Sequence, residues 1–155
     1  MEHEKFMREA IALAVENVRN GGGPFGAVIV KDGEVVSTGV NRVTANNDPT
    51  AHAEVSAIRA ACSKLGTFDL SGTVLYTSCE PCPMCLGAIY WAHIDKIYYG
   101  ANQYDAAKAN FDDSFIYKEL ELEPQKRHKP IVNILRDEAQ APFDEWRAKE
   151  DKIAY

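Results

Sequence analysis

Three residues with the right chemistry to bind zinc lie in two separate segments of the chain. His52 follows a polar loop, and Cys82 and Cys85 lie further along, in the run Cys-Glu-Pro-Cys-Pro-Met-Cys. Imidazole nitrogen and thiolate sulfur are common zinc ligands, and a catalytic zinc keeps one of its four positions open for water. Three protein ligands leave that position open. Glu54, two residues after His52, then remains free to move protons.

A closed zinc site that only stabilises the loop is the alternative, and it needs a fourth protein ligand. Cys79 is the candidate, because it precedes Cys82 by three residues. The same spacing matches the first three ligands of an iron–sulfur cluster, but the fourth Cys and the trailing Pro of the bacterial pattern are missing. Cys62 falls on the apolar face of a predicted helix and is expected in the core. We expect the open site, because a closed one would leave Glu54 without a role.

Composition narrows the class of protein and its partners. The 155 residues are 46% hydrophobic and 26% charged, as in a single soluble domain. The net charge of −6 argues against a nucleic-acid partner, which requires clustered Lys and Arg. The first residues lack the pattern of a secretion signal, and no apolar run approaches the ~18 residues of a membrane span. We therefore expect a cytoplasmic protein with reduced cysteines that binds neither nucleic acid nor membranes.

Hydrophobic periodicity and turn residues predict the elements that must position these ligands. The expected elements are helix 4–20, strands 27–30 and 34–39, helix 51–65, strand 73–77, helix 83–93, strand 97–100, a helix ending near 120, strand 131–135 and helix 142–152. Asp32-Gly33 predicts a hairpin turn. Thr50 is the candidate N-cap of the second helix, and Pro83 fits the first turn of the third.

This order of elements predicts a three-layer α/β/α sandwich with a mixed central sheet of about five strands. Both groups of candidate ligands lie at predicted helix N-termini, where the helix dipole favours thiolates and a bound hydroxide. His52 and Glu54 are two residues apart and would not share a face inside a helix. They can reach one site only from the first turn, beside the capping loop.

Several motifs resemble those of the cytidine deaminase superfamily (the cytidine and deoxycytidylate deaminase family), in the branch that acts on free bases and on tRNA adenosine. They are Pro24-Phe25-Gly26-Ala27, Asn41, Thr50-Ala51-His52-Ala53-Glu54 and the run Cys79–Cys85. The resemblance covers roughly residues 6–100. The later stretch 110–119 and the ending at Tyr155 are similar to the bacterial guanine deaminases of that superfamily.

This resemblance implies a cytidine deaminase-like fold, hydrolysis of guanine to xanthine and ammonia, one zinc ion per subunit and a homodimer. It implies that zinc is bound by His52, Cys82 and Cys85, and that Glu54 is the proton shuttle. Asn41, the Ala53 backbone and Asp113 would hold the base. In a single deaminase domain of residues 1–155, the segment 110–155 would be the substrate-recognition and C-terminal tail region.

The hydrogen-bond donors of guanine indicate that a carboxylate recognises the base. The N1–H and 2-amino groups of guanine are adjacent donors, which one carboxylate can accept together. Asp112 and Asp113 are therefore both candidates, and Asp113 is also expected to help ammonia leave. The alternative role for each is to cap the helix that begins at Ser114.

Aromatic residues complete the expected site. Phe25 and Trp91 could sandwich a flat ring, although core packing is the stronger expectation for Trp91. We expect Tyr155 to fold over a pocket, with the pocket of a partner subunit as one possibility. Two other functions stay open: deamination of another base or nucleoside, such as tRNA adenosine, cytosine or a pterin-like ring, and a zinc-stabilised binding module.

Overall fold

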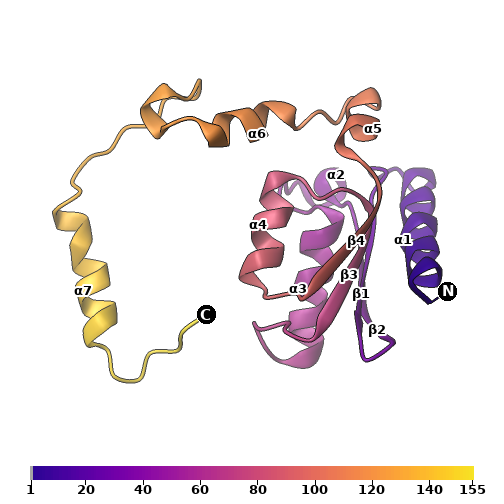
Figure 1. Ribbon diagram of the computed structural model, residues 1–155, viewed down its shortest axis with the longest axis horizontal. Helices are drawn as coiled ribbons and strands as arrows, with labels where there is room; N and C mark the ends of the chain where they lie inside the picture. The colour runs from indigo at the N-terminus through magenta and orange to yellow at the C-terminus, as the bar shows by residue number, and fades with distance from the viewer. Residues whose placement is uncertain (1) are drawn as a thin grey trace. The chain divides into compact units, whose positions relative to one another are not determined.

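The computed structural model describes residues 2–155, which divide into two compact units. The first unit ends at Ser114, and the second runs from Phe115 to Tyr155. In the first unit a mixed sheet lies between helices on both of its faces (Figure 1). This is the cytidine deaminase-like α/β sandwich that the sequence predicts.

The sheet comprises β1 (Gly26–Lys31), β2 (Glu34–Val40), β3 (Thr73–Cys79) and β4 (Lys96–Ala101). Its order is β2-β1-β3-β4, with β1 antiparallel to both neighbours and β3 parallel to β4. The hairpin turn is where the sequence places it, because Asp32 and Gly33 both have positive φ (52° and 78°), as a tight two-residue loop requires.

Alternate residues of β1 build two separate cores. Val28 and Val30 pack on one face against α1 (Glu2–Arg19), through Phe6 and Ala10. Ala27 and Ile29 face the opposite core, which α3 (Ala53–Leu65) and α4 (Pro83–Trp91) cover; its other buried members are Ala53, Ala57, Ala61, Leu70, Leu75, Ile89 and Ala92. Both faces of the strand are therefore buried, which explains its continuous apolar run.

Two glycines set how closely helices approach the sheet. A Cβ on Gly26 would lie 2.4 Å from the Ala10 carbonyl oxygen in α1. On the opposite face, a Cβ on Gly39 would lie 2.2 Å from the Ala53 carbonyl oxygen in the first turn of α3. Gly39 thus fixes the end of α3 that carries His52 and Glu54.

Short helices complete the first unit. Residues 43–46, expected in a loop, form α2 (Val43–Asn46), and α5 (Gln103–Lys108) follows β4. Helix α5 was not predicted from the sequence, and it begins with a capping box formed by Asn102 and Asp105.

The second unit consists of α6, which begins at the boundary (Ser114–Glu121), two 3-10 turns (Pro124–Lys126 and Glu138–Gln140) and α7 (Ala141–Ala148). The expected strand 131–135 does not form, so the sheet has four strands within residues 2–155 rather than about five. Apolar, β-branched residues favour a strand only where a neighbouring strand and a packed face are available. Leu135 also has a positive φ of 53°, which ends an extended segment. No helix in residues 2–155 is both long and apolar enough to cross a membrane.

Candidate active site

The N-termini of α3 and α4 bring the candidate ligands together. His52 is the N-cap residue of α3, and Cys82 is the N-cap residue of α4. Pro83 occupies the first turn of α4, as expected, and the Cys85 N–H donates to Cys82 Sγ at 3.5 Å. Thr50 was predicted as the cap of α3 but lies two residues too early. Its hydroxyl instead donates to Asp48 Oδ1 at 2.6 Å, within the loop that leads to His52.

The three ligand atoms have the separation that a tetrahedral zinc ion requires. His52 Nδ1 lies 3.5 Å from Cys82 Sγ and 3.5 Å from Cys85 Sγ, and all three atoms lie within 4.8 Å of one another. Usual Zn–N and Zn–S bond lengths place neighbouring corners of the tetrahedron roughly 3.6 Å apart. The two nitrogen–sulfur separations therefore suit binding of one zinc ion.

The two cysteines differ in acidity because they share a hydrogen bond. The hydrogen bond from Cys85, together with one from His52, lowers the pKa of Cys82 to about 4. The same bond to Cys82, with burial, raises the pKa of Cys85. Cys82 is thus the more acidic of the two, and metal binding would deprotonate both thiols.

Glu54 lies beside this cluster, in the first turn of α3, and is 5% exposed. Burial raises its pKa to about 7, further supported by the charge of Cys82 and partly offset by hydrogen bonds and by His52. A carboxyl group with this pKa exchanges protons readily at neutral pH. Position and acidity both suit a proton shuttle.

Cys79 stands apart from the three ligands. Its thiol donates to the Asn102 carbonyl oxygen at 3.8 Å, and burial raises its pKa to about 11. Within residues 2–155, the group of three or more potential metal ligands consists of His52, Cys82 and Cys85. The arrangement therefore matches the open site rather than a closed site with Cys79 as the fourth ligand.

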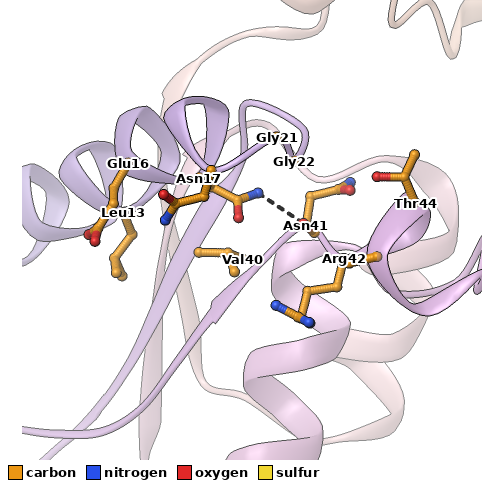
Figure 2. Close-up of a pocket in the computed structure, with 11 residues that line it drawn as sticks. Leu13, Glu16, Asn17, Gly21, Gly22, Val40, Asn41, Arg42 and Thr44 are labelled. Atoms are coloured by element: carbon orange, nitrogen blue, oxygen red, sulfur yellow. Dashed lines mark hydrogen bonds between the residues drawn. The ribbon is translucent and has the colours of Figure 1, made fainter.

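Asn41 and Phe25 meet at a corner next to the segment that carries His52. The Asn41 N–H donates to the Phe25 carbonyl oxygen at 3.3 Å, and the following N–H, of Arg42, donates to the Ala51 carbonyl oxygen at 2.9 Å. Asn41 is buried and lines a pocket of about 490 Å³ between α1 and α2 (Figure 2). Arg42, the residue after Asn41, is thus hydrogen-bonded to Ala51, which directly precedes His52.

The two aspartates before α6, Asp112 and Asp113, have different surroundings. Asp112 Oδ1 accepts from the Ser114 N–H at 2.9 Å, which is the capping role. Asp113 is half-buried, and burial together with the negative charges of Cys82 and Glu80 raises its pKa. Asp113 therefore lies within electrostatic reach of Cys82.

The sequence model of the cytidine and deoxycytidylate deaminase zinc-binding region matches residues 1–101, which contain all three ligands and Glu54. The chain belongs to the cytidine and deoxycytidylate deaminase family. Its zinc-binding signature thus coincides with the geometric cluster.

Relatives within this family differ in how much of the chain they match. Guanine deaminase of Bacillus subtilis (strain 168) is 54% identical over the full length of both chains. The X-ray structure of guanine deaminase from Bacillus subtilis has a TM-score of 0.97 and covers 100% of this chain and 99% of that chain. The tRNA-specific adenosine deaminase of Agrobacterium fabrum is 45% identical over 64% of this chain and 66% of its own. A mutant protein solved in complex with 8-azaguanine is 34% identical, has a TM-score of 0.70 and covers 72% of this chain and 64% of that chain.

Two residues predicted for the deaminase site, Trp91 and Tyr155, have exposed side chains. Trp91 is the last residue of α4, about 13 Å along the helix axis from Cys82. It is 67% exposed, so it is not the core residue that its apolar helix suggested. Tyr155 belongs to the second unit and is exposed. Base contacts by these two residues stay predictions.

Two further residues next to Phe25 and Asn41 were not predicted from the sequence, namely Phe111 and Asn17. The ring of Phe111 packs edge-on against Phe25, with centroids 5.0 Å apart. Asn17 is buried in α1 and hydrogen-bonds to Asn41. A signal for Asn17 was present, because a polar residue follows Ala10 and Ala14 on the apolar stripe of the predicted helix.

Proposed function

We propose that this protein is a zinc-dependent guanine deaminase that converts guanine and water to xanthine and ammonia. The observation that carries the proposal is the zinc-sized cluster of His52, Cys82 and Cys85 beside buried Glu54. The match to a guanine deaminase over the full chain supports guanine as the substrate, because it includes the C-terminal segment as well as the zinc-binding region.

One zinc ion per subunit is held by His52 Nδ1 and the two sulfurs. Bound zinc lowers the pKa of its water toward ~7 and so supplies the nucleophile at neutral pH. The protein contributes two fixed helix ends, whose dipoles favour the thiolates. It also supplies a neighbouring group that can take up the proton.

Glu54 transfers the protons. Its carboxylate accepts a proton from the attacking water as the new C–O bond forms at C2 of guanine. It gives that proton to a ring nitrogen, producing a tetrahedral carbon that carries both oxygen and the amino group. A second transfer, from the oxygen to the amino nitrogen, lets ammonia leave as the C=O bond of xanthine forms. Asp113 assists at the departing amino group.

The base is held by groups on several elements. The Asp113 carboxylate accepts from N1–H and the 2-amino group, each such charged hydrogen bond contributing roughly 1.5–3 kcal/mol. Asn41 and the Ala53 backbone, at the start of α3, bind polar atoms of the ring. Phe25 stacks on one face of the base, and Trp91 is the proposed partner on the other face.

The proposal extends to the setting of the enzyme. Segment 110–155 recognises the substrate, and Tyr155 closes over a pocket and shields the base from water. The enzyme works as a cytoplasmic homodimer that binds neither nucleic acid nor membranes.

Deletion of Tyr155 tests whether this residue covers the pocket. Unchanged kcat and KM for guanine would exclude a covering role.

Conversion of guanine to xanthine is the direct test. Zinc-loaded protein is incubated with guanine, and both purines and ammonia are quantified over time. One xanthine and one ammonia should appear for each guanine lost. Zinc-stripped protein should be inactive and regain activity when zinc is restored. Persistent failure of the zinc-loaded protein to consume guanine would reject the proposal.

Deamination of tRNA adenosine is the second candidate, because the Agrobacterium fabrum relative is a tRNA-specific adenosine deaminase. It is not favoured. That match covers 64% of this chain, whereas the match to guanine deaminase covers all of it, and the net charge of −6 is unfavourable for a polyanion. An assay on tRNA anticodon stems separates the two functions, since inosine formation without guanine turnover would select the second.

A further inference from the structure

We propose that Asn17 is a positioning residue that holds two base-contacting residues, Asn41 and Phe25, in a fixed relation to each other. The inference rests on the proposed deamination of guanine and gives a role to a buried amide in α1. Asn17 acts through these two residues and does not itself touch the substrate.

A ring of hydrogen bonds carries this inference. Asn17 Nδ2 donates to the Asn41 carbonyl oxygen at 2.9 Å and to the Gly23 carbonyl oxygen at 2.8 Å. The Gly23 oxygen also accepts from the Phe25 N–H at 2.9 Å, and the Phe25 oxygen accepts from the Asn41 N–H at 3.3 Å. Asn17 is the side chain that closes the ring. Figure 2 shows its bond to Asn41 between α1 and the end of β2.

The surroundings of Asn17 leave it little freedom to move. Its side chain is 8% exposed, and a Cβ on Gly22 would lie 2.4 Å from its Nδ2 atom. The Gly22 N–H in turn donates to the Asn17 carbonyl oxygen at 2.8 Å. A Cβ on Gly23 would lie 3.0 Å from Cγ of Asn41, so this glycine admits the second amide side chain. The corner is packed around two amides.

The chemistry of the amide group explains why asparagine suits this position. A side-chain NH₂ group has two donors, and the ring uses both of them on backbone carbonyl groups. Burying a polar side chain costs stability unless its hydrogen bonds are made. Asn17 occupies the same buried stripe of α1 as Ala10 and Ala14, which carry no polar side-chain atoms. Asn17 therefore differs from Ala10 and Ala14 in its hydrogen-bond donors.

The corner is also tied to the catalytic helix. The Arg42 N–H donates to the Ala51 carbonyl oxygen, and His52 follows Ala51. Asn17 thus holds Asn41 through the Asn41 carbonyl oxygen. The next residue, Arg42, is hydrogen-bonded to the segment that carries His52. Loss of the Asn17 donors should displace Asn41 and weaken base binding, while the zinc ligands keep their places.

A double-mutant cycle tests this coupling. Asn17→Asp keeps the size of the side chain but removes both donors, and Asn20→Asp makes the same change at an exposed position just beyond α1. Both are made in the zinc-loaded protein, alone and combined with Asn41→Ala. Calorimetry measures the Kd of 8-azaguanine, and zinc content and the melting temperature are measured alongside. Asn17→Ser is a second, smaller replacement if Asn17→Asp does not fold.

We expect Asn17→Asp to raise the Kd of 8-azaguanine about tenfold with full zinc content, and Asn20→Asp to leave it unchanged. In the Asn41→Ala background, Asn17→Asp should raise the Kd by less than it does alone, because the part of its effect that passes through the Asn41 side chain is already lost. Unchanged binding in Asn17→Asp, or effects that simply add, would overturn the inference and leave the proposed function intact. Unchanged binding in Asn41→Ala would overturn it together with the base-binding role of Asn41. Failure of the unmodified protein to turn over guanine would be a separate result. It would count against the proposed function and not against the positioning role of Asn17.

Discussion

At the scale of single residues, burial determines what Glu54 can do. A carboxyl group in water is almost fully ionised at neutral pH and is a poor proton donor. Burial at the start of α3 raises its pKa to about 7. Glu54 can then both accept and donate a proton near neutral pH.

Replacement of Glu54 by Gln should separate proton transfer from metal binding. The side chain keeps its size but cannot accept a proton, so kcat for guanine should fall roughly 10²–10⁴-fold while zinc content stays the same. The control is Glu34→Gln, an exposed residue of the hairpin, which should be fully active. Near-normal turnover by Glu54→Gln would rule out the proton-shuttle role.

The two adjacent aspartates should respond differently to the same change. Asp113→Asn turns one acceptor oxygen into a donor that faces the donors of guanine, and KM for guanine should rise at least tenfold. Asp112→Asn keeps an oxygen that can accept from the Ser114 N–H, so both the melting temperature and KM should stay close to normal. Steady-state kinetics and thermal unfolding of both variants check this. A larger rise of KM in Asp112→Asn would reverse the assignment.

At the scale of elements, the sequence predicts well where local and tertiary preferences agree. Helix α1, the hairpin and the start of α4 at Pro83 lie where periodicity and turn residues place them. Cap positions were harder, since Thr50 is the better capping residue by type but His52 occupies the N-cap of α3. The tertiary contact between α3 and Gly39 decides where that helix begins, and single-residue preferences do not contain this contact.

A side chain at Gly39 should disturb the site by moving α3. In Gly39→Ala the added Cβ meets the Ala53 carbonyl oxygen, and overpacking of this kind costs about 1–3 kcal/mol. Because His52 and Glu54 move with α3, zinc affinity should fall along with stability. Gly87→Ala is the matched control, as nothing lies within 4 Å of its Cβ, and it should be neutral or stabilising. Chemical denaturation and a zinc competition assay give both values, and equal behaviour of the two variants would contradict the role of Gly39.

At the scale of the whole molecule, the candidate metal ligands come from segments that are far apart in the chain. His52 comes from the start of α3 and the two cysteines from the start of α4, across strand β3. The sequence could predict these ligands because their residue types and spacing are chemically specific. It could not predict the absence of a strand at 131–135, because strand formation depends on which surfaces pack together.

Zinc removal should therefore destabilise the folded protein. A ligand that binds only the folded state adds about 2.7 kcal/mol when present at a hundred times its Kd. A chelator should lower the melting temperature, and zinc should restore it. Cys82→Ser should lose most of this response, whereas Cys62→Ser, which changes a cysteine outside the cluster, should keep it. A melting temperature that is indifferent to zinc in the unmodified protein would argue against the site.

The most direct test of the central claim compares ammonia release by the zinc-loaded protein from guanine, adenine, cytosine, cytidine and guanosine under identical conditions. A site whose carboxylate reads the N1–H and 2-amino edge should favour guanine at least a hundredfold over adenine and cytosine. Faster release from adenine or cytosine would keep the zinc site and Glu54 but contradict guanine as the substrate and Asp113 as its reader.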